Sequence, residues 1–266
     1  MKFENKLEII FEINFSEYYN TGVYTDSNEN KNKLNINTYG GIHNNKKIGE
    51  VYILGSTLKG LFKENINKIF SSLKKGNLDN LFGFINGEKS KKARLIIEDA
   101  FLVDDKFRTK MNNSDYNEIV KSINIYTPMK NNKNIPIFCE VVDKNKVFSS
   151  KLTLNNMEII ELFAILQIFN LSYYDEIRIG SNKKRGCGLA KLKIKEFNLE
   201  LKSNDIFTEN ELNEYFEINN DKSIKIKDKY LTTVYRLKNT AFNFENIEDE
   251  NNKFLNCILG KVFTND

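Results

Sequence analysis

Tryptophan is absent from the 266-residue sequence, and proline, histidine and cysteine are scarce, with two, one and three residues. The cysteines, Cys139, Cys187 and Cys257, are far apart and form no CxxC pair. A structural zinc ion needs four cysteine or histidine ligands at characteristic spacings, so the sequence argues against a zinc site. We expect no metal and no cofactor, and the odd number of cysteines fits a reducing, intracellular compartment.

Long apolar runs are missing as well. Residues 1–6 lack the apolar stretch of a signal peptide. No segment approaches the roughly 20 apolar residues that a membrane-spanning helix needs. We therefore expect a soluble, cytoplasmic protein that makes no membrane contact.

Positive charge is modest in total, at a net +4, but it is concentrated in one region. Residues 203–266 carry 8 basic and 12 acidic side chains, a net charge of −4, which leaves +8 on residues 1–202. Residues 176–195 alone carry 7 basic side chains and 1 acidic side chain. Such a concentration suits a phosphate-binding surface, although a lysine-rich surface can also serve only to keep a protein soluble.

A turn before a helix is the first candidate site. Apolar residues at helical spacing predict a helix over residues 57–75. Gly55 permits a tight turn before it, and the hydroxyl of Ser56 or Thr57 can cap it.

The start of this helix suits a phosphate group. Its free amides, at residues 56–59, and its partial positive charge attract anions. Lys59 and Lys63, four residues apart, add positive charge on one face. The alternative is an ordinary capped helix that holds no ligand.

A glycine-punctuated basic loop is the second candidate. It has the sequence RIGSNKKRGCGL at residues 178–189 and leads into an alternating strand at residues 189–195. Its candidate ligand-binding residues are Gly180, Lys183, Lys184, Arg185, Gly186 and Gly188. The glycines let a ligand approach the backbone, and the basic side chains attract anions. The loop is neither a Walker loop nor a dinucleotide fingerprint, and the alternative is a solvated hairpin turn.

Together the two turns resemble the repeat-associated RAMP superfamily of CRISPR proteins, and more closely the backbone subunits of type III CRISPR effector complexes. Further matches follow in the expected order, with LFG at residues 81–83, ARLIIEDA at residues 93–100 and FCEVV at residues 138–142. The resemblance covers residues 5–200 of the chain.

The predicted elements indicate an α+β fold. Strands are expected at residues 7–15, 93–103, 138–142 and 146–154. A second helix is expected from Asn155, its cap, with Glu158 at the capping-box position, to Leu171. The order strand, helix, strand, strand, helix, strand is that of a ferredoxin-like or RRM-like core.

This core is expected to form a domain over residues 1–202, with insertions at about residues 16–50 and 104–137. Residues 203–266 are expected to be a C-terminal extension that packs on the core. Within it, the sequence predicts a short capped helix at residues 208–216, strand near residues 230–244, and a helix or strand at residues 253–263.

The resemblance implies a role for the loop before the first helix. In active backbone subunits an aspartate follows a glycine pair there and promotes metal-dependent cleavage of target RNA. The matching stretch here, Gly40-Gly41-Ile42-His43, has His43 near that position. Neutral imidazole does not replace a carboxylate as a ligand of Mg²⁺. The resemblance therefore implies an RNA-binding subunit that does not cleave by this route.

The function implied is that of a crRNA-binding subunit. It would bind the guide and the guide–target duplex, together with other effector subunits, copies of itself and a separate nuclease. A projecting "thumb" with Met129, Ile135 and Pro136 would pry the duplex open, as apolar wedges do elsewhere.

Two alternatives remain open. A metal-independent crRNA-processing endoribonuclease could use His43 as general acid or base on a ribose 2′-OH. A scaffold protein without RNA would use its glycine loops only as turns.

Overall fold

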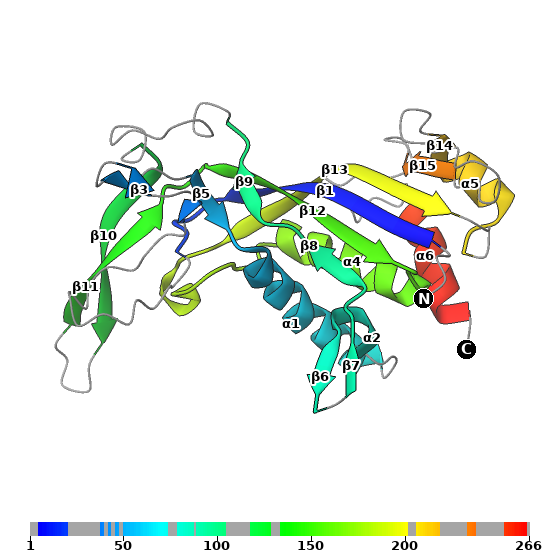
Figure 1. Cartoon of the computed structure of the whole chain (residues 1–266), viewed down its shortest axis with the longest axis horizontal. Coiled ribbons are helices and arrows are strands. Elements are labelled where there is room, and N and C mark those ends of the chain that lie inside the picture. Colours follow the sequence, from blue (N-terminus) through cyan, green and yellow to red (C-terminus); the bar gives the residue numbers. More distant parts are fainter. Residues whose placement is uncertain are drawn as a thin grey trace.

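The computed structural model describes residues 5–20, 38–39, 42–43, 46–47, 50–73, 79–87, 89–104, 118–128, 134–201, 206–218, 233–237 and 253–264. Within these residues the centre of the molecule is one antiparallel sheet (Figure 1), with the strand order β14-β15-β13-β1-β12-β9-β5-β2 and with β8 also paired to β12. Its strands are β1 (Asn5–Phe15), β2 (Thr38–Tyr39), β5 (Glu50–Ile53), β8 (Leu95–Ile97), β9 (Ala100–Leu102), β12 (Val147–Asn155), β13 (Ala190–Leu201), β14 (Phe216–Ile218) and β15 (Thr233–Leu237).

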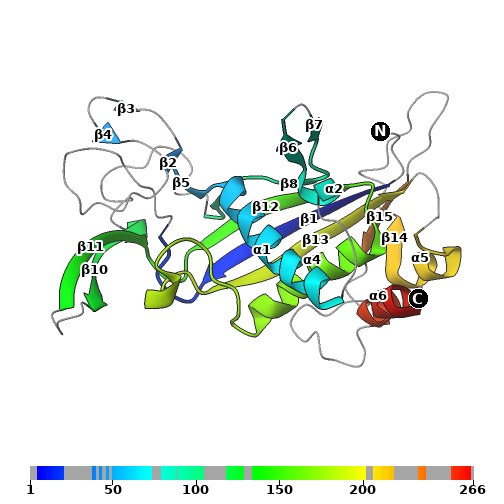
Figure 2. The ribbon, with the colours of Figure 1, turned by 90° about the horizontal axis from the view of Figure 1, so that it is seen from below.

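Two long helices cover one face of this sheet (Figure 2). They are α1 (Gly55–Leu73) and α4 (Ile159–Tyr173). The other helical segments are α2 (Asp79–Phe82), the 3-10 turn η2 (Lys183–Arg185), α5 (Glu209–Tyr215) and α6 (Lys253–Thr264). Three hairpins stand apart from the sheet: β3 (Ile42–His43) with β4 (Lys46–Lys47), β6 (Phe84–Asn86) with β7 (Lys89–Lys91), and β10 (Val120–Pro128) with β11 (Asn134–Val142). Among the described helices, none is long and apolar enough to cross a membrane.

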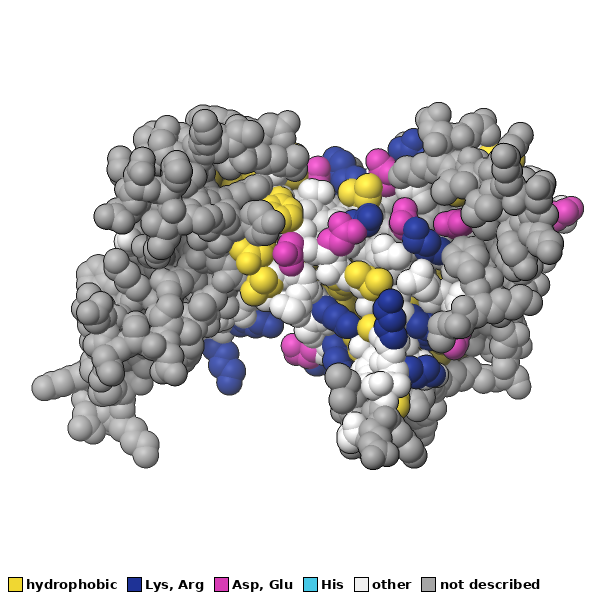
Figure 3. Space-filling model, in the orientation of Figure 1, with side chains coloured by type: hydrophobic (Ala, Val, Ile, Leu, Met, Phe, Trp, Pro, Cys, Tyr) yellow, Lys and Arg dark blue, Asp and Glu magenta, His cyan; other side chains and the backbone are white. Residues whose placement is uncertain are grey.

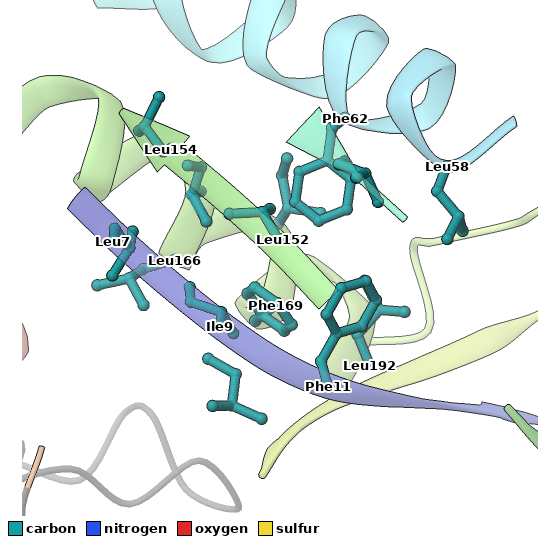
Figure 4. Close-up of a cluster of buried hydrophobic side chains, with 14 of the residues drawn as sticks. Leu7, Ile9, Phe11, Leu58, Phe62, Leu152, Leu154, Leu166, Phe169 and Leu192 are labelled. Atoms are coloured by element: carbon teal, nitrogen blue, oxygen red, sulfur yellow. The ribbon is translucent and has the colours of Figure 1, made fainter. Parts of the chain in front are cut away.

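The hydrophobic core lies between the sheet and these helices. Every second residue of β1, from Leu7 to Phe15, is buried, as the alternation of its sequence predicts. Phe11 of β1 meets Phe62 of α1 and Phe169 of α4, with ring centroids 6.2 and 5.6 Å away (Figure 4). These contacts hold both helices on the same face.

The α+β class expected from the sequence is confirmed. Along the chain the core elements follow in the order β1, α1, β8 and β9, β12, α4 and β13. In the sheet, β1 and β12 lie between β13 and β8. The finer assignment to a ferredoxin-like or RRM-like core stays a prediction.

Two predicted boundaries are wrong for identifiable reasons. The expected strand at residues 93–103 is divided into β8 and β9, because the backbone between them turns toward the start of α1. Asn155 does not cap α4, since it still pairs with Lys6 as the last residue of β12. The N-cap is Glu158, whose backbone amide donates to the carboxylate of Glu161 at 3.0 Å.

The second expected insertion contains regular structure. β10 and β11 pair in register from Val120 opposite Val142 to Pro128 opposite Asn134. This hairpin includes residues 138–142, which were predicted to form a separate strand. It projects from one end of the molecule (Figure 1).

The described part of residues 203–266 continues both the sheet and the core. Thr208 caps α5 and forms a capping box with Glu211, as predicted. β15 pairs with β13, and α6 resolves the last segment as a helix. Its Phe254 is fully buried among the rings of Phe197, Phe207, Tyr215 and Phe216. The division into two domains at residue 202 stays a prediction.

Candidate nucleic-acid interface

At the start of α1, the backbone amides of Gly55, Thr57 and Leu58 donate hydrogen bonds to other groups of the chain. The backbone amide of Gly55 donates to Oδ1 of Asp99 at 2.6 Å, and the amides of Thr57 and Leu58 donate to the carbonyl of Leu54 at 2.9 and 3.2 Å. The capping group is thus the Asp99 carboxylate rather than a hydroxyl of Ser56 or Thr57. An anion at this helix start would share the site with a carboxylate, which makes the expected amide-bound phosphate less favourable.

Gly55 is explained by packing within the chain. A Cβ atom at this position would lie 2.4 Å from the carbonyl oxygen of Ile97. Gly60 differs, because a Cβ atom there would meet nothing within 4 Å and the residue is exposed. A glycine inside a helix costs roughly 0.5–1 kcal/mol relative to alanine, and no contact among the described residues accounts for this one.

The two lysines of the first candidate site point to the LFG segment. Nζ of Lys59 donates to the carbonyl oxygen of Phe82 at 3.2 Å. Nζ of Lys63 lies 5.9 Å from the centroid of the Phe82 ring. Both side chains therefore join α1 to α2, and Lys63, which is exposed, also presents its charge to solvent.

The ARLIIEDA segment supplies a buried ion pair. Arg94 is 6 % exposed and donates to the carbonyl oxygens of Asn80 and Asn156 and to both carboxylate oxygens of Glu161. Burial raises the pKa of Glu161, while the backbone of Glu158 and the guanidinium of Arg94 act in the opposite direction. Arg94 therefore links α2, the loop before α4 and α4 itself, which is a structural role.

Two of the three glycines in the basic loop are required by the fold. Gly180 and Gly188 have φ angles of +88° and +82°, and added Cβ atoms would lie 2.1 Å from Asn20 O and 2.0 Å from Ile179 O. Gly186, with φ +80°, is exposed and would meet nothing within 4 Å. Of the three, only Gly186 leaves its backbone open to a ligand.

The positive charges of the loop gather at its tip. Lys183, Lys184 and Arg185 form the η2 turn, in which Nη1 of Arg185 donates to Oδ1 of Asn182 at 3.1 Å. Lys184 and Arg185 are exposed, and Lys183 is half-buried. Arg178, at the base, is instead paired with a carboxylate, and this hydrogen bond with Glu17 raises its pKa.

The loop tip and α1 lie on the same side of the sheet, the side that the helices cover (Figures 1 and 2). Glu64 of α1 provides a more local link. Its pKa is lowered by the hydrogen bond from Lys68 at 2.9 Å, and further by the positive charges of Lys68 and Lys183. Gly60 is one turn before Glu64 and so shares its face of the helix. The positive charge of Lys183 therefore acts on the face of α1 that holds Gly60. We call the exposed Gly60 and the basic loop tip, residues 183–186, together the cradle.

A short segment after β1 connects the basic loop to the β10–β11 hairpin. The backbone amide of Gly188 donates to Tyr18 O, and that of Ser181 donates to Asn20 O, both at 2.8 Å. Between them, Tyr19 exchanges two backbone hydrogen bonds with Val142 of β11. The insertion predicted at about residues 16–50 begins with this segment, and the prediction did not include the connection. The adjacent Tyr18 and Tyr19, with Tyr19 fully buried, were the available signal.

The remaining candidate residues are described only in part. His43 lies in β3 opposite Lys46 of β4. Ile135 and Pro136 lie in β11, opposite Thr127 and Tyr126.

The side chains of His43, Ile135 and Pro136, and the whole of Met129, lie outside the described residues. Over the described part of the chain, no group of three or more His, Cys, Asp or Glu residues could hold a metal ion.

Comparisons with known proteins give a matching family model and solved structures of similar fold. The sequence model of the RAMP superfamily matches residues 36–265. A chain of the structure titled "Type IV-B CRISPR Complex" has a TM-score of 0.52 and 9 % identity, over 71 % of this chain and 90 % of that chain. Another, from "Cryo-EM structure of the Type III-B Cmr-beta bound to cognate target RNA", has a TM-score of 0.47 and 13 % identity, over 74 % of this chain and 61 % of that chain. No curated protein matches the sequence.

Proposed function

The chain belongs to the RAMP superfamily, and from this premise we propose that it is the crRNA-binding backbone subunit of a CRISPR effector complex. The cradle supports the proposal, because exposed backbone and a cluster of cations lie on the same side of the sheet. The similar fold of a chain in the structure titled "Type IV-B CRISPR Complex" supports the assignment to a CRISPR complex.

The sugar-phosphate backbone of the guide would run across the cradle. Lys183, Lys184 and Arg185 would neutralise phosphates, and the exposed glycines Gly60 and Gly186 would allow the backbone of the RNA to approach that of the protein. Such contacts do not distinguish bases. They suit a guide whose sequence is read by base pairing, since the protein then recognises only shape and backbone.

The proposed subunit binds RNA without cleaving it through a metal ion. His43 stands near the position where the resemblance implies an aspartate, and imidazole is a poor ligand for Mg²⁺. Cleavage would then come from a partner nuclease or from sister subunits that retain the aspartate.

The β10–β11 hairpin is the proposed thumb. It projects from the sheet, and its base is bonded through Tyr19 to the segment that also holds the basic loop. Met129, Ile135 and Pro136 would lie along its outer part and separate neighbouring bases of the guide–target duplex.

The direct test is purification of the chain from its native host, followed by sequencing of any bound RNA. Small RNAs that begin with repeat-derived tags, together with other effector subunits, are the expected result. Recovery of no RNA would support the scaffold alternative. Metal-independent cutting of repeat RNA that is lost in His43→Ala would instead identify the processing endoribonuclease.

A further inference from the structure

Two neighbouring tyrosines at the end of α4 are exposed without an assigned role. Tyr173 and Tyr174 are 41 % and 43 % exposed. Their ring centroids are 5.4 Å apart and the ring planes are at 88°. Other large apolar side chains of comparable exposure in the described part of the chain, such as Ile96 and Phe263, are not sequence neighbours of one another. The pair is therefore a local concentration of exposed aromatic surface.

The backbone presents this pair in a fixed conformation. Asp175 adopts a left-handed conformation with φ +60°, and the amide of Glu176 donates to Leu171 O at 3.0 Å. Together with the bond from Asp175 N to Ser172 O, at 3.3 Å, this is the pattern of a Schellman motif. The buried hydroxyl of Ser172 also accepts from Leu192 N at 3.0 Å and so fastens the helix end to β13.

The surroundings of the pair are charged rather than apolar. Nζ of Lys191 lies 5.7 Å from the centroid of the Tyr173 ring and 3.6 Å from Oδ1 of Asp175. The chain enters the basic loop directly after the pair, and residues 176–195 carry 7 basic side chains and 1 acidic side chain. An apolar protein partner would leave these charges desolvated, whereas a nucleic acid offers bases to the rings and phosphates to the lysines.

We propose that Tyr173 and Tyr174 form a stacking platform for unpaired bases of a single-stranded RNA that continues beyond the cradle. This inference rests on the proposed function, because it requires that the chain binds RNA. Aromatic rings stack on any base, so such a platform holds a guide of any sequence, as the cradle does. Lys191 lies on the rim of the platform, where its charge can reach a phosphate.

The test compares paired variants for their binding of a fluorescently labelled single-stranded RNA of mixed sequence, over a series of salt concentrations. Replacing both tyrosines by alanine is expected to weaken binding about 5- to 100-fold at every salt concentration, since stacking is worth roughly 1–3 kcal/mol per base. The slope of log affinity against log salt should stay unchanged, because no phosphate contact is removed. Replacing both by phenylalanine should preserve the affinity.

Phe263→Ala is the matched control, since this aromatic side chain is 53 % exposed at the end of α6, in the acidic part of the chain. The Phe263→Ala variant should bind RNA with the affinity of the unmodified protein.

Asp175→Asn removes the carboxylate beside Tyr173, and asparagine tolerates the left-handed conformation of this position. It should tighten RNA binding by about two- to fivefold.

Tyrosine fluorescence gives a second readout, because the chain has 12 tyrosines and no tryptophan. RNA binding should quench the part of the emission that comes from Tyr173 and Tyr174. The variant with both tyrosines replaced by phenylalanine should bind RNA equally well but show less quenching.

The outcomes separate the two proposals. If the unmodified protein binds no RNA, the proposed function and the platform are both wrong. If it binds RNA and the double alanine variant binds equally well, the platform alone is wrong. Loss of a co-purifying protein subunit with unchanged RNA affinity would show that the tyrosines form a protein contact instead, and would also overturn the platform.

Discussion

Gly60 gives a prediction in which stability and function change in opposite directions. The residue lies in the interior of α1, is exposed, and has no atom within 4 Å of the place where a Cβ would stand. Gly60→Ala should therefore raise the free energy of unfolding by about 0.5–1 kcal/mol, because alanine loses less backbone entropy on folding. For a domain of this size that corresponds to a rise in Tm of about 1–4 °C.

If an RNA backbone approaches α1 at Gly60, the same methyl group should weaken RNA binding. Gly260 is the matched control, since it is also an exposed glycine inside a helix, α6, with nothing within 4 Å of its Cβ position. Gly260→Ala should raise Tm by a similar amount and leave RNA affinity unchanged. The measurements are thermal unfolding and RNA titration of both variants. Equal RNA affinity of the Gly60→Ala variant and the unmodified protein would refute a close approach of RNA to α1.

Three further predictions concern contacts that stabilise the fold. Arg94→Met should destabilise the protein by about 3–5 kcal/mol at neutral pH, because it leaves the Glu161 carboxylate buried without its partner. Chemical denaturation should show that Arg94→Met lowers the free energy of unfolding less at acidic pH, because the Glu161 carboxyl, whose pKa is raised by burial, is protonated there. The loss should also be smaller in the double variant Arg94→Met, Glu161→Leu. Gly188→Ala should destabilise markedly and Gly186→Ala by only about 1–2 kcal/mol, since the first also brings a Cβ onto a carbonyl oxygen; equal losses would contradict this reasoning. Asp99→Ala should cost about 1 kcal/mol through loss of the α1 cap, and an unchanged denaturation midpoint would contradict that role.

The core was predictable because its signals are local. The alternation of β1 and the helical spacing of the apolar residues in α1 and α4 are properties of short stretches of sequence. Burial then follows, as the contacts among Phe11, Phe62 and Phe169 show.

The candidate site was predictable only in outline, since its details depend on residues far apart in the chain. The cap of α1 comes from Asp99, 44 residues after Gly55, and no local pattern indicates this pairing. The close packing that requires Gly180 involves Asn20, which lies in the insertion predicted at about residues 16–50. The charge of the basic loop could be read from composition, whereas its division into a structural base and an exposed tip could not.

The salt dependence of RNA binding tests the central claim most directly. Lys184, at the loop tip, and Lys253, at the start of α6, are both exposed lysines, so that Lys184→Ala and Lys253→Ala form a matched pair. We predict that Lys184→Ala makes the slope of log affinity against log salt shallower by about 0.7 to 1, which is the loss of one phosphate contact, and that Lys253→Ala leaves it unchanged. Identical slopes for both variants and the unmodified protein would contradict RNA binding at the basic loop.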